Sequence, residues 1–366
     1  MEITSPLTYC PNFRNVSDRL RTLYDRRGLD QAFAVTEPPS PALDRFAAQH
    51  TEGYCPVPEL RERLAFWDAH LQRKSAVCDD GVPAAYLSEC DQGLYGAMVG
   101  GRIEYMAHPE NGWISSMVEP VLRDWSELES LAVDAGCTAF RQFGRQLDTF
   151  RRGSSGRFGI SHFILIDGLN FVFELLGATR TYLALYDEPD RVRQAIDLAF
   201  QLNVLVQDTF FAAGLQVEGG TCSNMVQWIP GRIVSESVDP FHMASLDVFE
   251  QWGRGPVERI LARYDGGVLH IHGNGRHLLE TVATLRGLKA IFLADDVGFP
   301  RAFDLLPDMR RRVGDMPLVV SCRCDEITES LASRGLTGGV LYHVHGVPDA
   351  TTANRLMDRI RACRCS

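Results

Sequence analysis

The sequence lacks any run of about 18 consecutive apolar residues, the length that a membrane-spanning helix requires. It also lacks an excess of basic residues, because 37 Lys and Arg stand against 47 Asp and Glu and the formal net charge is -10. Such an acidic chain does not favour a nucleic-acid-binding surface. Residues 1–7 contain neither a basic nor an apolar segment, so we expect no secretory signal and a cytoplasmic protein.

Motifs of several common enzyme classes are missing as well. No Gly-x-Gly-x-x-Gly follows a strand-like segment, and no Gly-Lys-Ser/Thr phosphate loop, Gly-x-Ser-x-Gly elbow or His-Glu-x-x-His helix occurs. Their absence disfavours dinucleotide-binding, phosphate-loop, serine-hydrolase and metalloprotease chemistry. The 10 cysteines are mostly scattered singly. In a chain of this length without a secretory signal, we expect reduced thiols rather than disulfides.

The sequence does contain a regular alternation of strand-like and helix-like segments. The alternation predicts βαβ units and a parallel sheet. About eight strands fit a single (β/α)8 TIM barrel better than an open sheet, because polar residues follow nearly every strand. We expect residues 1–80 to form a mostly helical N-terminal extension packed on a barrel of residues 81–366. The clearest predicted strands are 84–88, 158–166, 215–218, 267–272, 290–294, 318–322 and 340–345, and Ser245 is the expected N-cap of a helix over 245–264.

Two His-x-His pairs stand at the ends of predicted strands. His270 and His272 end one apolar run, and His343 and His345 end the last one. Residues two apart on a strand point to the same side, so each pair can present two imidazoles to one mouth of a barrel. Imidazole is a common zinc ligand, and three protein ligands with one open position are typical of a catalytic zinc site. We predict that His270, His272 and His345 bind a metal ion, with Zn²⁺ as the expected ion.

Other polar residues at predicted strand ends are secondary candidates. Asp295 and Asp239 could orient a metal ligand or act as a base. His242 and His277 are interpreted as capping or surface residues. The sequence leaves open whether the site also includes His343, Cys322 or Cys222, and further polar side chains at these ends are Cys90, Asp91, Asp167, Asp296 and Cys324.

Five segments, taken in their order along the chain, resemble a known family. They are 159–177, 186–192, 239–249, 345–354 and the segment Leu-His-Ile-His-Gly-Asn at 269–274. Together they resemble the uroporphyrinogen decarboxylase superfamily and, within it, the cobalamin-dependent methyltransferase branch, whose zinc motif is His-x-Cys-Gly-Asn. The resemblance covers roughly residues 80–366 and implies a single (β/α)8 barrel with its site at the C-terminal mouth.

In that branch, zinc held by His-x-Cys and a later cysteine presents a thiolate to a methyl group on a corrinoid. By position, the resemblance implies His270, His272 in place of the first cysteine and His345 in place of the second as ligands. Asn274 and Asp167 are the expected cofactor-binding residues. Neutral imidazoles in place of two thiolates make the metal a stronger Lewis acid but leave a bound thiolate less nucleophilic.

We therefore expect a zinc-dependent methyltransferase-like enzyme that moves a methyl group between a corrinoid and a small acceptor. A separate corrinoid protein could supply the corrinoid. One alternative is a metal-free decarboxylase of the same fold, although the superfamily's arginine-bearing N-terminal decarboxylase signature is missing. Another is a metal-dependent hydrolase, although hydrolase barrels of the amidohydrolase type carry His-x-His on their first strand. A binding role with an inactive site is a fourth possibility, and the oligomeric state is left open.

Overall fold

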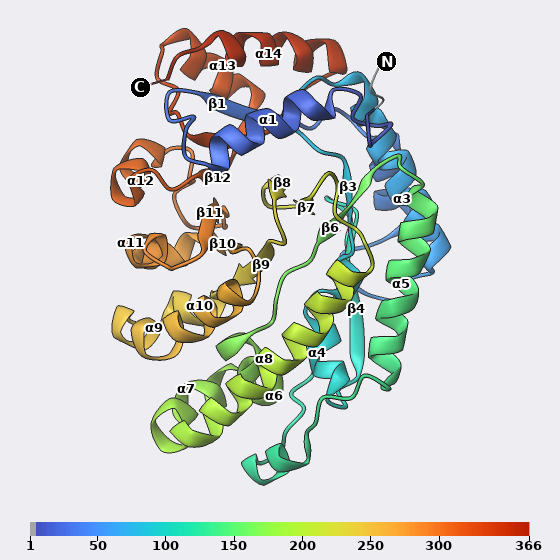
Figure 1. Cartoon of the computed structure of the whole chain (residues 1–366), viewed down its shortest axis with the longest axis vertical. Coiled ribbons are helices and arrows are strands. Elements are labelled where there is room, and N and C mark those ends of the chain that lie inside the picture. Colours follow the sequence, from blue (N-terminus) through green and yellow to red (C-terminus); the bar gives the residue numbers. More distant parts are fainter. Residues whose placement is uncertain (1–4, 366) are drawn as a thin grey trace.

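A parallel sheet of six strands is the main element of the fold in this computed structural model, which describes residues 5–365. The strand order is β1-β13-β12-β11-β10-β9, and every neighbouring pair is parallel. Helices cover one face of this sheet, with α9 to α12 lying outside the strands β9 to β12 (Figure 1). The six strands are β1 (Ala32–Thr36), β9 (Val234–Ser237), β10 (Gly267–Ile271), β11 (Leu288–Leu293), β12 (Leu318–Arg323) and β13 (Val340–His345).

Two smaller sheets complete the strand pairing. In the four-stranded sheet, β3, β6 and β7 are parallel and β8 is antiparallel to β7. In the three-stranded sheet, β4 pairs antiparallel with both β2 and β5. Their strands are β3 (Ala84–Tyr86), β6 (Gly159–His162), β7 (Gly220–Ser223) and β8 (Gln227–Pro230), then β2 (Gly53–Cys55), β4 (Ile103–His108) and β5 (Trp113–Val118).

The six-stranded and four-stranded sheets meet along both edges. Ile164, just after β6, forms an isolated parallel bridge with Ser235 of β9. At the other edge, the backbone N–H of Asp80, which precedes β3, donates to the carbonyl oxygen of Ala34 on β1 (2.9 Å). The strand pairing in residues 5–365 thus shows a mixed α/β fold with a parallel six-stranded sheet, but no continuous ladder around a closed barrel.

Helices connect most of these strands. None of the helices within residues 5–365 is both long and apolar enough to cross a membrane. The expectation of no secretory signal rests partly on residues 1–4, which lie outside the described residues. The helices are α1 (Phe13–Tyr24), α2 (Pro41–Gln49), α3 (Leu60–Gln72), α4 (Gly93–Met98), α5 (Thr138–Ser154), α6 (Gly168–Leu176), α7 (Ala178–Asp187), α8 (Pro189–Ala212), α9 (Leu246–Trp252), α10 (Arg254–Arg263), α11 (Leu279–Ala283), α12 (Leu306–Val313), α13 (Cys324–Ala332) and α14 (Ala350–Ala362), with 3-10 turns η1 (Arg73–Ala76), η2 (Ser88–Cys90), η3 (Trp125–Ser130), η4 (Asp239–Met243) and η5 (Gly273–Leu278).

The two faces of the main sheet carry different residues, because side chains alternate along each strand. On β10, Leu269 and Ile271 belong to the large core that the sheet forms with the surrounding helices. Val268 belongs instead to a second core, which also contains Leu341 of β13. We call the face that carries Val268 the inner face. By this alternation His270 lies on the inner face, whereas Cys322 belongs to the core on the helix-covered face.

Two strand predictions differ from the structure. Ala32–Thr36 lies in a stretch expected to be mostly helical, yet it forms β1 at the edge of the main sheet, and all five of its residues are buried. A short apolar run buried on both faces shows no alternation, so its periodicity does not identify it as a strand. The strand predicted at 215–218 is wrong, because Glu218 and Gly219 have positive φ angles (47° and 73°) and form a turn before β7.

Candidate metal centre

The candidate site lies at the C-terminal ends of β9 and β10. These strands pair in register, with Ser237 opposite His270. The chain turns into η4 directly after β9, so Asp239 lies beside the end of β10. His270 is on β10 and His272 follows the strand, and their spacing of two residues directs both imidazoles to the inner face.

Asp239, His270 and His272 bring three possible ligand atoms together. One atom from each side chain lies within 4.8 Å of the other two. The Oδ1 atom of Asp239 is 3.0 Å from Nε2 of His270 and 3.8 Å from Nε2 of His272. Ligand atoms of a tetrahedral zinc ion lie roughly 3.3 Å apart, given zinc–ligand distances of about 2.0–2.1 Å. The separations around Asp239 Oδ1 therefore match those that a shared ion requires.

The Oδ1 atom of Asp239 provides a test of whether a metal fits here. This oxygen is buried, and it has no hydrogen-bond partner among residues 5–365 although Nε2 of His270 is 3.0 Å away. A buried carboxylate oxygen without a partner is unfavourable. Two imidazole nitrogens and one carboxylate oxygen form the ligand set of several catalytic zinc sites. These residues therefore fit a zinc ion, which would bind an oxygen that otherwise accepts no well-aligned hydrogen bond from the described residues.

Asp296 orients His272. Its Oδ1 lies 2.8 Å from Nδ1 of His272, and its Oδ2 accepts the backbone N–H of Gly273 (2.6 Å). An imidazole that donates its Nδ1–H to a carboxylate keeps its Nε2 lone pair for a metal. Burial opposes ionisation of Asp296, but the Gly273 N–H and His272 outweigh it and hold the pKa of Asp296 below its usual value. A side chain at position 273 would meet Phe299, since a Cβ there would be 2.7 Å from the Phe299 Cβ.

The buried carboxyl of Asp91 adds a further ionisable group near the site. Its Oδ2 accepts the hydroxyl of Tyr86 (2.8 Å), and its Oδ1 has no partner among the described residues. Burial raises the pKa of Asp91 to about 7, although the Tyr86 hydrogen bond and His270 act in the opposite direction. Burial lowers the pKa of His270, but Asp239 and Asp91 more than offset it, so the net shift is upward. A carboxyl that titrates near neutral pH is suited to proton transfer.

His242 also lies in this site, so its interpretation as a capping or surface residue is wrong. Its side chain is buried, and its Nδ1 is 3.6 Å from Oδ1 of Asp239. Burial lowers the pKa of His242 to about 4. A Cβ at position 275 would overlap the His242 ring, so Gly275 leaves the space that this ring occupies. The Asp239-x-x-His242 spacing, which places both side chains on one face of a helical turn, was the available signal.

Comparisons with known proteins identify a structural relative. Neither the search of protein-family models nor the search of curated proteins gives a match. Among solved structures, a methyltransferase from Methanosarcina mazei matches with a TM-score of 0.61 and 17% sequence identity, covering 95% of this chain and 98% of that one. The chain shares that protein's fold. At this identity the likeness concerns the fold alone.

His345, predicted as the third ligand, is not among the three side chains that come together. It is exposed at the end of β13, whereas His270 is buried on β10. Two strands, β11 and β12, separate β13 from β10 in the sheet, and neighbouring strands lie about 4.8 Å apart. His345 instead lines a separate cavity together with His343.

The aspartate next to Asp296 has a different environment. Asp295 accepts the backbone N–H of Ala302 (2.7 Å) and contacts the guanidinium of Arg276 (3.2 Å). It thereby holds the segment that follows β11, whereas Asp296 contacts the imidazole of His272. The sequence pair Asp295-Asp296 does not distinguish these environments, because both residues follow the same strand.

The other predicted site residues have surroundings of their own. Asn274 is exposed in η5, and Asp167 is buried at the start of α6, where its charge raises the pKa of Glu236 in addition to the effect of burial. Cys222 and Cys322 are buried, and burial raises the pKa of each thiol to about 12. His277 is exposed and hydrogen-bonds the carbonyl oxygen of Ala244 (2.9 Å), as expected of a surface residue.

Proposed function

We propose that this chain is a metal-dependent methyltransferase-like enzyme whose Asp239, His270 and His272 bind Zn²⁺. The convergence of three ligand atoms at Oδ1 of Asp239, a buried oxygen that accepts no well-aligned hydrogen bond within residues 5–365, carries the metal part of the proposal. The fold shared with the methyltransferase from Methanosarcina mazei and the resemblance of 269–274 to a zinc motif support the methyltransferase part. In this proposal Asp239 takes the third ligand position that the sequence assigned to His345.

We also infer that the parallel strands form a barrel of the uroporphyrinogen decarboxylase type. The adjacent edges at Ile164–Ser235 and Ala34–Asp80 support a circuit of β1, β3, β6 and β9 to β13. A cytoplasmic location, a small acceptor and a corrinoid supplied by a partner protein belong to the same proposal.

The side chains have separate roles in this proposal. Bound zinc would supply a Lewis acid that polarises a coordinated group. Asp296 keeps Nε2 of His272 directed to the site through its contact with Nδ1. Asp91, held by the Tyr86 hydroxyl, is placed to accept or release a proton near His270. The ring of His242 excludes water from one side of Asp239.

Metal analysis tests the proposal. We expect protein purified without added metal to contain about one zinc per chain, and His272→Ala and Asp239→Asn to lose most of it. His277→Ala is the matched control, because His277 is an exposed histidine of the neighbouring turn η5. Equal metal contents in wild type, His272→Ala and Asp239→Asn would contradict the site. A metal-free wild type would instead favour the decarboxylase alternative.

A metal-dependent hydrolase is the second candidate, and the donor set is the observation that favours it. Two histidines and a carboxylate hold zinc in several hydrolases that activate water. Methyl transfer from methylcobalamin to a thiol, compared with hydrolysis of ester and amide substrates by the same zinc-loaded sample, separates the two candidates. Loss of either activity in His272→Ala assigns that activity to the metal centre.

A further inference from the structure

A cavity separate from the metal centre opens at the ends of β1, β3 and β13. Its lining does not include Asp239, His270 or His272. Its volume is about 460 Å³, which lies within the usual range for small-molecule sites. Tyr86 links this cavity to the metal centre. Its ring lines the cavity, and its hydroxyl donates a hydrogen bond to Asp91 (2.8 Å). Asp91 in turn acts electrostatically on His270. The wall of the cavity therefore contacts Asp91, a carboxyl of the proposed reaction site.

Aromatic rings from three elements line this cavity. Trp67 comes from α3, Tyr86 from β3 and Trp113 from β5. The Tyr86 and Trp113 rings meet edge to face, with centroids 5.0 Å apart and planes at 67°. Trp and Tyr faces attract cations, and groups of such rings are the usual binding sites for methylated ammonium ions.

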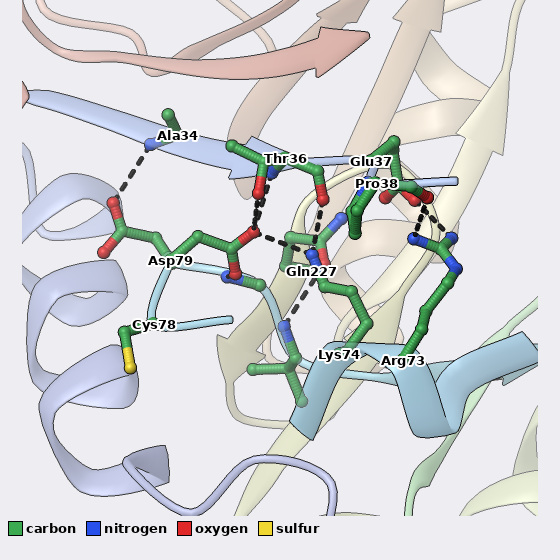
Figure 2. Close-up of polar contacts among 12 residues, drawn as sticks. Ala34, Thr36, Glu37, Pro38, Arg73, Lys74, Cys78, Asp79 and Gln227 are labelled. Atoms are coloured by element: carbon green, nitrogen blue, oxygen red, sulfur yellow. Dashed lines mark hydrogen bonds and ion pairs between the residues drawn. The ribbon is translucent and has the colours of Figure 1, made fainter. Parts of the chain in front are cut away.

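The two basic side chains of the cavity are engaged by other partners. Figure 2 shows Lys74 directed to Asp79 and to the carbonyl oxygen of Thr36, at 2.7 and 2.6 Å. Arg73 is ion-paired with Glu37 and donates to the carbonyl oxygen of Pro38 (3.0 Å), also in Figure 2. Each cation is therefore balanced by a neighbouring carboxylate, although Nε of Arg73 has no hydrogen-bond partner among the described residues.

The other ionisable lining residues include two carboxylates, Asp44 and Glu110, and three histidines, His70, His343 and His345. Burial lowers the pKa of both His70 and His343 to about 4, so these imidazoles are neutral at pH 7. Asp44 and Glu110 line the cavity and are exposed. Within residues 5–365 neither forms an ion pair with Lys or Arg. Glu110 lies 4.0 Å from Nδ1 of His108, and the absence of a Lys or Arg partner for either carboxylate in this part of the chain favours a cation over an anion in the cavity.

We propose that this cavity binds a methylated ammonium group, such as the quaternary nitrogen of a small organic cation, against the rings of Trp67, Tyr86 and Trp113. The lining of the cavity alone supports the binding site. The suggestion that the bound cation is a substrate rests on the proposed methyltransferase function.

Binding of choline and of its neutral isostere 3,3-dimethyl-1-butanol, measured by isothermal titration calorimetry, tests the site. The two probes have the same shape but differ in charge, so we expect choline to bind at least about tenfold more tightly. Trp113→Leu should weaken choline binding about tenfold, and Glu110→Gln, at an exposed position, should weaken it by a few fold while leaving the isostere unaffected. Equal affinities for the two probes, or unchanged choline binding in both variants, would overturn the proposal.

Zinc content measured in the same samples distinguishes this inference from the proposed function. Trp113→Leu should retain zinc and a native circular dichroism spectrum, and His272→Ala should lose zinc but retain choline binding. A protein that holds zinc and shows no preference for choline overturns the cavity proposal alone. A protein that binds choline and holds no zinc overturns the metal centre alone.

Discussion

At the scale of single residues, the metal centre depends on which atom each side chain directs inward. The sequence predicted His270 and His272 together, because the spacing of two on a strand fixes their common side. The sequence assigned Asp239 a catalytic role rather than a role as a metal ligand. Asp239 follows β9, whose sequence Val-Ser-Glu-Ser has too few apolar residues to be recognised as a strand. The proximity of Asp239 to His270 arises from the pairing of β9 with β10, which a single sequence does not specify.

The Asp296–His272 contact leads to a prediction at this scale. We expect Asp296→Asn to weaken zinc binding about 10- to 100-fold, because the ring of His272 loses the carboxylate that fixes its orientation. Competition with a chromogenic chelator measures this affinity. Asp295→Asn is the matched control and should have a clearly smaller effect, since Asp295 contacts Arg276 and Ala302 instead. A larger loss in Asp295→Asn would show that the roles of the two aspartates are reversed.

At the scale of secondary-structure elements, long apolar strands and capped helices were predictable and short elements were not. The strands over β10 to β13 and the N-cap at Ser245 were predicted, and the Ser245 hydroxyl accepts the N–H of Val248 (3.4 Å). The single helix expected over 245–264 is instead two, α9 and α10, divided at Gly253. A Cβ at Gly253 would be 2.6 Å from the Phe249 ring and 3.0 Å from the Phe241 ring, and helical periodicity does not reveal this crowding.

The cap of α9 gives a prediction for stability. Ser245→Ala removes the acceptor for the Val248 N–H, so we expect the free energy of unfolding to fall by about 1 kcal/mol. Urea denaturation followed by circular dichroism measures the change. Ser245→Asp retains a side-chain acceptor and should be close to wild type. Equal destabilisation by both substitutions would indicate that the hydroxyl is not acting as a cap.

At the scale of the whole molecule, buried neutral histidines set the response to acid. Burial lowers the pKa values of His70 and His162 to about 4, below the ordinary value of 6.5. The unfolded chain therefore binds protons at these positions at a higher pH than the folded chain does. Stability from this source is complete above about pH 6.5 and is lost as the pH falls towards 4, by up to about 3 kcal/mol for each histidine.

Urea denaturation at several pH values between 7 and 4 measures this loss. We expect His162→Asn to flatten the dependence of the unfolding free energy on pH, because one of the buried titrating groups is removed. His277→Asn, at an exposed histidine, should leave the slope unchanged. A slope in His162→Asn equal to that of wild type would contradict the assignment.

The pairing of β1 with β13 also affects how the chain acquires its structure. Among the described residues β1 pairs only with β13, which lies near the opposite end of the sequence, and the backbone N–H of Cys365 donates to the carbonyl oxygen of Asp30 (2.9 Å). During synthesis on the ribosome, the amide groups of β1 on that side have no strand partner until residues 340–345 emerge. The edge of the main sheet at β1 is therefore completed only once two segments far apart in the sequence have both been made and have met.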